Sequence, residues 1–197
     1  MKEIRVRIIH SESAIKPIID GARRGVDRFK AYGVTCEEAV VSRTTVDDIR
    51  GGEFLLSAVS STGLILVRGE NFTPSFRELR SHRRAKTHLI GLGLTDAVII
   101  YSDTSLEVSH GISTSFGALI STYVHEMDDI ALKSLALESV VKHELGHVFG
   151  VSGHCEDTSC IMENLRNFYE QFIKSRRDFC ARCIPIITAK IKELRES

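Results

Sequence analysis

Residues 143–155 read HELGHVFGVSGHC, a run that predicts a helix, a sharp turn and a metal site in close succession. His143 and His147 lie four residues apart, about one helical turn, so both imidazoles leave the same face of the helix. Gly150 is expected to end the helix, because glycine accepts the left-handed conformation that reverses the chain. The reversed chain can then bring His154 to the same metal. Three imidazoles suit Zn²⁺ and leave a fourth tetrahedral position open, as in catalytic zinc sites.

Glu144 follows the first of these histidines and is displaced by about 100° around the helix axis. From this position its carboxylate can approach the metal from the side without being a ligand. A base that takes a proton from a zinc-bound water needs such a position. Hydrolysis is therefore the leading functional hypothesis.

Four of the five cysteines lie close together after this run, and they are Cys155, Cys160, Cys180 and Cys183. Two disulfides would need an oxidising compartment. The charged opening of the chain, residues 1–7, lacks the apolar core of a signal peptide, so we expect a cytoplasmic protein. A redox Cys-x-x-Cys pair usually opens a helix after a strand, whereas this pair follows a predicted helix and precedes Pro185. A structural zinc held by four cysteines is therefore favoured. Cys36, on a predicted strand, is expected to be a small buried hydrophobe.

Together these motifs resemble the archaemetzincins, a branch of the metzincin clan of zinc peptidases. The clan is similar in its His-Glu-x-x-His-x-x-Gly motif, its nearby third histidine and its following methionine, here Met162. The branch is similar in the cysteine directly after the third histidine and in two intervals: four residues separate Cys155 from Cys160, and seventeen separate Met162 from Cys180. The family usually has two residues between the glycine and the third histidine, whereas this chain has three. We expect Gly153 to absorb the extra residue in a bulge.

The resemblance covers about residues 143–183, and more loosely 96–125. It implies two zinc ions per chain, a catalytic one on the three histidines His143, His147 and His154 and a structural one on the four cysteines. It also implies that Met162 forms a hydrophobic floor beneath the metal, the Met-turn, without coordinating it. The strand expected at residues 117–123 would be the edge strand that faces the cleft, where an extended peptide substrate can pair with its backbone.

Outside this region, apolar alternation predicts strands near residues 2–9, 36–42, 64–67, 97–101 and 117–123. Helical periodicity predicts helices near residues 11–33 (with Ser11 as N-cap), 75–91, 131–149, 164–180 and 184–195. These alternations favour an α/β (α+β) fold with a mixed, partly parallel sheet. Gly146 costs about 1 kcal/mol inside a helix, which suggests close packing of the histidine-bearing helix against the sheet.

The chain has 197 residues, 43% of them hydrophobic and 26% charged, which is typical of one globular domain. With the resemblance, we expect a single metzincin-like metallopeptidase domain, in which a twisted mixed sheet has backing and active-site helices. Residues 1–150 would form its N-terminal subdomain, and residues 151–197 a smaller helical C-terminal subdomain with the Met-turn and the cysteine site. No run of eighteen apolar residues predicts a membrane span. A formal net charge of zero gives no electrostatic reason to expect a nucleic-acid partner. No pattern predicts an oligomeric state.

The predicted function is zinc-dependent hydrolysis of peptide bonds, with Glu144 as the base that activates the water and then protonates the leaving amine. One alternative is a catalytically weak or inactive zinc-containing peptide-binding protein of the same fold. Another is a different zinc-dependent amide hydrolase, such as a deacylase. A zinc-stabilised interaction or nucleic-acid module centred on the cysteines is a third, and the neutral net charge counts against it.

Overall fold

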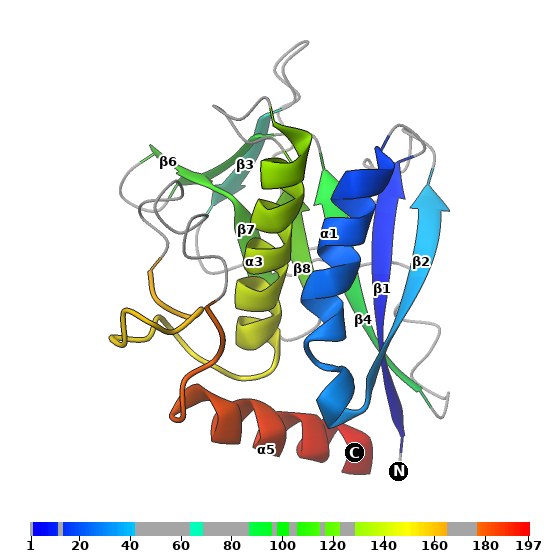
Figure 1. Ribbon diagram of the computed structural model, residues 1–197, viewed down its shortest axis with the longest axis vertical. Coiled ribbons are helices and arrows are strands. Elements are labelled where there is room, and N and C mark those ends of the chain that lie inside the picture. The colour runs from blue at the N-terminus through cyan, green and yellow to red at the C-terminus, as the bar shows by residue number, and fades with distance from the viewer. Residues whose placement is uncertain are drawn as a thin grey trace.

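A five-stranded mixed sheet, in the order β2-β1-β4-β8-β7, forms the centre of the computed structural model (Figure 1). Its strands are β1 (Glu3–Ser11), β2 (Val34–Val41), β4 (Thr87–Thr95), β7 (Gly111–Thr114) and β8 (Gly117–Ser121). Neighbouring strands from β2 to β8 pair in parallel, and β7 pairs antiparallel with β8. The predicted mixed, partly parallel sheet is therefore confirmed. The structure describes residues 2–11, 14–41, 64–68, 87–95, 98–102, 106–114, 117–122, 129–164 and 177–197.

The strand β1 shows why this sheet forms. Ile4, Val6 and Ile8 alternate along it and are fully buried, as the two-residue period of a strand requires. The intervening Arg5 and Arg7 both form ion pairs with Glu37 on the neighbouring β2. The apolar side chains of β1 thus lie in the core, and the arginines between them pair with a charged residue of the neighbouring strand.

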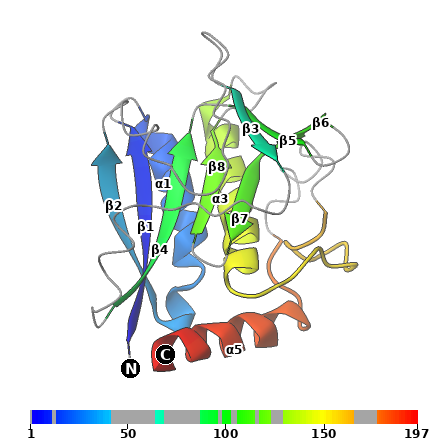
Figure 2. The ribbon, with the colours of Figure 1, turned by 180° about the vertical axis from the view of Figure 1, so that it is seen from behind.

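Two helices, α1 (Lys16–Asp27) and α3 (Ile130–Val148), pack on one face of the sheet, and the view from behind shows the strands in front of both (Figures 1 and 2). Two glycines of α1 let them approach closely. A Cβ at Gly21 would lie 2.3 Å from the Ser134 carbonyl oxygen, and one at Gly25 would lie 2.7 Å from the Val141 Cβ. The helix α3, which carries two of the predicted ligands, therefore packs both on the sheet and against α1.

The start of α1 differs from the prediction. Ser11 is the last residue of β1 rather than a helix N-cap, and Ile15 occupies the N-cap position without a side-chain hydrogen bond. Pro17 lies in the first turn, where its fixed φ suits a helix start. After α1, the short helix η1 (Lys30–Tyr32) ends at Gly33 in the left-handed conformation, which confirms Gly33 as the end of this helical region.

A second, three-stranded sheet has the order β3-β5-β6, with β3 (Leu64–Arg68), β5 (Val98–Ser102) and β6 (Leu106–Ser109). The strands predicted near 64–67 and 97–101 are present in it. The helix predicted at 75–91 is wrong at its end, because residues from Thr87 onward form β4; residues 75–86 lie outside the described part of the chain. Ile90 and Leu92 are fully buried in β4. Pairing with β1 and β8 on both sides outweighs the helical spacing of its apolar residues.

The predicted edge strand is also in a different place. The strand at Gly117–Ser121 is present as β8, but it lies between β4 and β7, and all five of its residues are buried. Among the described strands of this sheet, β7 forms the edge on that side. A strand with neighbours on both sides has no free backbone groups, so β8 is not the edge that was predicted at 117–123.

The end of the chain packs across one end of the sheet and its helices as α5 (Cys183–Glu196), close to the predicted 184–195 (Figure 1). The backbone N–H of Lys2 donates to the Arg195 carbonyl at 2.7 Å, so both chain ends meet there. Of the helix predicted at 164–180, residues 165–176 lie outside the described chain. Residues 177–180 are not helical, and Asp178 forms an isolated parallel bridge with Cys160. None of the helices described is long and apolar enough to cross a membrane.

Candidate metal centres and active site

The helix α3 begins and ends at residues that fix its position. The Asp129 side chain caps its N-terminus by accepting hydrogen bonds from the backbone N–H groups of Ala131 and Leu132. At the other end Gly150 has φ +94° and its N–H donates to the His147 carbonyl at 2.9 Å. The N–H of Val151 donates to the Gly146 carbonyl at 3.1 Å. These two bonds form a Schellman motif, so Gly150 reverses the chain as predicted.

The reversed chain brings His154 to His143 and His147. Their nitrogen atoms that could bind a metal all lie within 4.8 Å of one another. His143 is buried, His147 is half-buried and His154 is exposed, so the cluster reaches from the interior to the surface. Gly153 adopts φ +75° just before His154, with nothing close to its Cα on the side where a Cβ would be. The extra residue of this loop is thus accommodated by a glycine in the left-handed conformation.

The hydrogen bonds of the two helical histidines define which nitrogens are free. The Nδ1 of His143 lies 2.8 Å from the Ile161 carbonyl oxygen, and the Nδ1 of His147 lies 2.7 Å from the Val151 carbonyl oxygen. A carbonyl only accepts, so each Nδ1 carries the hydrogen and each neutral ring presents a lone pair at Nε2. Burial lowers the pKa of His143 to about 3, with a further contribution from His147, and it also lowers the pKa of His147. Both rings are therefore neutral at pH 7.

The two Nε2 atoms lie 3.1 Å apart. Two lone pairs cannot hydrogen-bond to each other, whereas a cation between them interacts with both. Two ligands bound tetrahedrally at 2.0–2.1 Å from zinc would lie about 3.3 Å apart, close to the observed separation. Carbonyl acceptors at Nδ1 are also the usual outer partners of metal-binding histidines. The donor set therefore fits a divalent metal such as Zn²⁺.

The Glu144 side chain lies between α3 and β7. Its side chain contacts Gly111 of β7, where a Cβ would lie 2.6 Å from the Glu144 Cγ and 2.8 Å from Oε1. The Ser113 side chain, two residues along the same strand, hydrogen-bonds to the carboxylate. Burial raises the pKa of Glu144 to about 7, and the hydrogen bond from Ser113 acts in the opposite direction. A carboxyl group with such a pKa can both accept and release a proton near neutral pH.

Met162 is fully buried and packs against α3. A Cβ at Gly146 would lie 2.3 Å from the Met162 sulfur and 3.0 Å from a ring carbon of Phe179. The close packing predicted at Gly146 is therefore real, but its partners are Met162 and Phe179 rather than the sheet. The prediction was wrong about the partner because these residues return to α3 only through the loops after it.

The four cysteines form a second cluster, in which the ligand atoms also lie within 4.8 Å of one another. Three sulfur pairs are 3.7 Å apart: Cys155 with Cys180, Cys160 with Cys183, and Cys180 with Cys183. A disulfide would need about 2.05 Å, and all four thiols are free. Sulfurs bound tetrahedrally at 2.3 Å from zinc would lie about 3.8 Å apart. The spacing fits a tetrahedral metal site.

Backbone groups support this cysteine cluster. The N–H groups of Met162 and Cys180 point at the Cys160 sulfur, at 3.5 and 3.4 Å. Burial raises the pKa of Cys160 and of Cys183. Burial also acts to raise the pKa of Cys180, but hydrogen bonds, first from the Cys183 and Arg182 backbones, lower it to about 6. Donors directed at sulfur stabilise thiolates, the form that binds metal.

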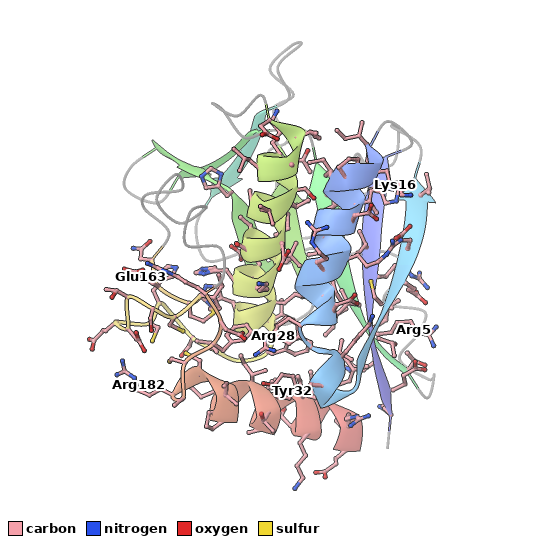
Figure 3. The ribbon with its side chains drawn as sticks, in the orientation of Figure 1. Arg5, Lys16, Arg28, Tyr32, Glu163 and Arg182 are labelled. Carbon is pink, nitrogen blue, oxygen red and sulfur yellow. The ribbon has the colours of Figure 1, made fainter. Side chains whose placement is uncertain are left out.

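Residues 154–162 connect the two clusters. His154 and Cys155 are adjacent, and the Cys155 N–H donates to the Met162 carbonyl at 2.7 Å. Residue 161, beside Met162, supplies the carbonyl that orients His143. Glu163 and Arg182, which flank the cysteine loops, lie on the side of α3 away from α1 (Figure 3). Cys36 takes no part: it is half-buried on β2, and burial raises its pKa to about 11. Its predicted burial is thus only partly confirmed.

Sequence reasoning named all seven clustered residues and Glu144, but it missed Gly111 and Ser113. The pattern Gly-x-Ser carries no chemical signal by itself, and its relation to Glu144 depends on β7 lying under α3. The prediction of the edge at residues 117–123 also placed it one strand too far inward.

Known structures share this fold. An archaemetzincin from Methanopyrus kandleri superposes with a TM-score of 0.66 at 21% identity, covering 96% of both chains. An archaemetzincin from Archaeoglobus fulgidus, solved with malonate, gives a TM-score of 0.60 at 16% identity, covering 92% of this chain and 99% of that one. A zinc-dependent peptidase from Methanocorpusculum labreanum gives 0.57 at 14% identity, with the same coverage. No functionally curated protein sequence matches the chain.

A comparison with protein families matches residues 87–189 to Peptidase family M54. This range contains both side-chain clusters, Glu144 and the strands β7 and β8. It also spans more than half of the chain. The chain therefore belongs to peptidase family M54, the archaemetzincin family of zinc-dependent peptidases.

Proposed function

We propose that this chain hydrolyses peptide bonds with a metal held by His143, His147 and His154 and with Glu144 as general base. The observation that carries the proposal is the pair of Nε2 lone pairs facing each other at 3.1 Å, each fixed by a carbonyl at Nδ1, beside a buried carboxylate. Zinc bound there would supply a Lewis acid that acidifies water and polarises a carbonyl. The open fourth position of such a site leaves room for both.

Residues of the chain would orient the metal-binding imidazoles and transfer the proton. The Ile161 and Val151 carbonyls hold the two helical imidazoles in one tautomer and orientation. Glu144 accepts the proton of the attacking water and later donates it to the leaving amine. Its burial, which raises its pKa to about 7, suits it to hold that proton between the two steps.

We also propose that the substrate is an extended peptide that pairs with the outer edge of β7. Within the described part of this sheet, β7 pairs with β8 on its other side only. Its inner residues reach Glu144, so a peptide on the outer edge would run beside the base. Because β7 pairs antiparallel with β8, this edge strand runs opposite to the other four strands of the sheet.

A second zinc on Cys155, Cys160, Cys180 and Cys183 would have a structural role, because four protein ligands leave no open position. It would join the loop after α3 to the first residue of α5. We propose a single domain, with residues 1–150 as one subdomain and residues 151–197 as the other, in which this zinc stabilises the smaller one.

The test compares zinc-loaded wild type with Glu144→Gln on a peptide library, with zinc content measured for both. Glu144→Gln should keep its zinc and lose cleavage by about 100-fold or more, the usual contribution of a general base. Glu138→Gln, the same change on the same helix, is the matched control and should cleave normally. Peptide binding by wild type without cleavage would favour the peptide-binding alternative. Hydrolysis of small acyl amides without peptide cleavage would favour a deacylase.

A further inference from the structure

We propose that Ser113 is a positioning residue for Glu144, and that Gly111 leaves the space in which the carboxylate is held. This inference rests on the proposed role of Glu144 as general base. Two residues of one strand touch the same side chain: Gly111 faces its Cγ and Oε1, and Ser113 hydrogen-bonds to the carboxylate. Residues two apart in a strand point to the same side, so this pairing follows from β7 lying under α3.

Burial makes the hydrogen bond from Ser113 important. Glu144 is only 7% exposed, and a buried carboxylate without a donor is costly. A glutamate side chain also has three rotatable bonds, and a base must hold its oxygen within hydrogen-bond reach of the proton that it removes. A hydroxyl fixed on a paired strand removes part of that freedom. Ser113 is fixed in this way, because it pairs with Ala118 of β8, which is itself fully buried.

Gly111 acts by its lack of a side chain. An added Cβ would lie 2.6 Å from the Glu144 Cγ, closer than van der Waals contact allows. The opposing atoms belong to a side chain rather than to backbone, so we expect the carboxylate to move and the strand to stay in place. A methyl group at this position should therefore displace the base.

The arrangement gives β7 two roles on two sides. Its outer edge is where we propose that the peptide pairs, and its inner face holds the base. The distance between the bound peptide backbone and the carboxylate is then set within one strand of four residues. Proximity of this kind matters because small displacements of a catalytic group lower rates steeply.

The experiment uses the zinc-loaded full chain and four variants: Ser113→Ala, Ser113→Thr, Gly111→Ala and Ser139→Ala. Ser139 is the matched control, a buried hydroxyl of α3 that donates to the Leu135 carbonyl of its own helix. We expect Ser113→Ala to lower kcat about tenfold with unchanged KM and zinc content, as for a lost hydrogen bond to a charged group. Ser113→Thr keeps the hydroxyl and should restore most of kcat. Gly111→Ala should lower kcat at least as much while melting close to wild type.

Two further measurements separate positioning from a general loss of structure. In the Glu144→Gln background, Ser113→Ala should cause no additional loss of rate. The ¹³C resonance of the Glu144 carboxyl group, assigned by its absence in Glu144→Gln, should shift in Ser113→Ala and Gly111→Ala but not in Ser139→Ala. A wild-type kcat in Ser113→Ala together with an unshifted resonance would overturn the inference. If wild type cleaves no peptide, the proposed function fails, and the resonance alone then decides whether Ser113 holds Glu144.

Discussion

At the scale of single residues, His154 and Cys155 are neighbours in the chain that belong to different clusters. His154 is the exposed member of the histidine cluster, and Gly153 before it has open space where a Cβ would lie. Cys155 after it is held by two contacts: its N–H donates to Met162, and its sulfur lies 3.7 Å from that of Cys180. The position of the third histidine therefore depends on the cysteine beside it.

Cys155→Ala is expected to weaken both metal sites. The cysteine site loses a ligand directly, and His154 loses its anchored neighbour, so we expect metal affinity at the histidine site to fall by about 10- to 100-fold. Zinc content after dialysis against a weak chelator measures both effects, with Cys36→Ala as the control cysteine. Two zinc ions retained per chain in Cys155→Ala would contradict the dependence of His154 on Cys155.

The same scale shows what residue patterns could and could not predict. The spacing of the histidines and cysteines follows from helix geometry and tetrahedral coordination, so the two clusters could be read from residues 143–183. The partners of Glu144 could not, because Gly111 and Ser113 reach it only through the placement of a strand that lies some thirty residues earlier in the chain. Side chains that meet through tertiary packing leave no local signal.

At the scale of elements, Glu138 links α1 to α3. Its carboxylate accepts from Arg24 of α1 at 2.8 Å and pairs with Lys142 of α3 at 3.0 Å. Partial burial acts to raise the pKa of Glu138, but the hydrogen bonds from Arg24 and Lys142 outweigh it and hold the pKa below its ordinary value. The folded state therefore favours the ionised form of Glu138.

This depressed pKa predicts an acid-dependent contribution to stability. The stabilisation that ionised Glu138 gains from Arg24 and Lys142 is fully present above the unfolded-state pKa of about 4.3. It is lost as the pH falls through the lower folded-state pKa. Urea unfolding should show Glu138→Gln less stable than wild type by about 1 kcal/mol at pH 7, with a smaller difference at pH 3. Glu193→Gln, which removes an exposed pair with Lys190, is the control and should change stability little at either pH. A difference that is the same at both pH values would contradict the assignment.

Elements were predictable where local periodicity and burial agree. Two-residue alternation located β1, and Gly150 ended α3 within a residue of the expected position. The segment at Thr87–Thr95 carries apolar residues compatible with a helix, and only its two parallel neighbours make it a strand. Which strand forms the edge likewise depends on the pairing of β8 with β4, a contact that no single segment encodes.

At the scale of the whole molecule, the region after α3 shares the hydrophobic core with the sheet and its helices, and polar contacts add to this packing. Arg28, near the end of α1 (Figure 3), donates from Nε to the Asp178 carboxylate at 2.6 Å. The Asp178 carbonyl accepts from the Ile161 N–H at 3.0 Å, and Asp178 also bridges to Cys160. The cysteine cluster is thus the point where the loops after α3, the segment before α5 and α1 meet.

The two proposed metal sites should therefore differ in what the loss of a ligand does to the fold. His147→Ala removes a ligand from the end of an already capped helix, so it should bind one zinc per chain and melt within a few degrees of wild type. Cys183→Ala removes the buried cysteine that begins α5, a proposed ligand of the second zinc. Since metal-binding free energy at such sites is folding free energy, its Tm should fall by roughly 10 °C or more. Metal analysis together with thermal unfolding of both variants checks this, with Cys36→Ala as the control. Equal losses of Tm in His147→Ala and Cys183→Ala would show that the histidine site stabilises the fold as much as the cysteine site does.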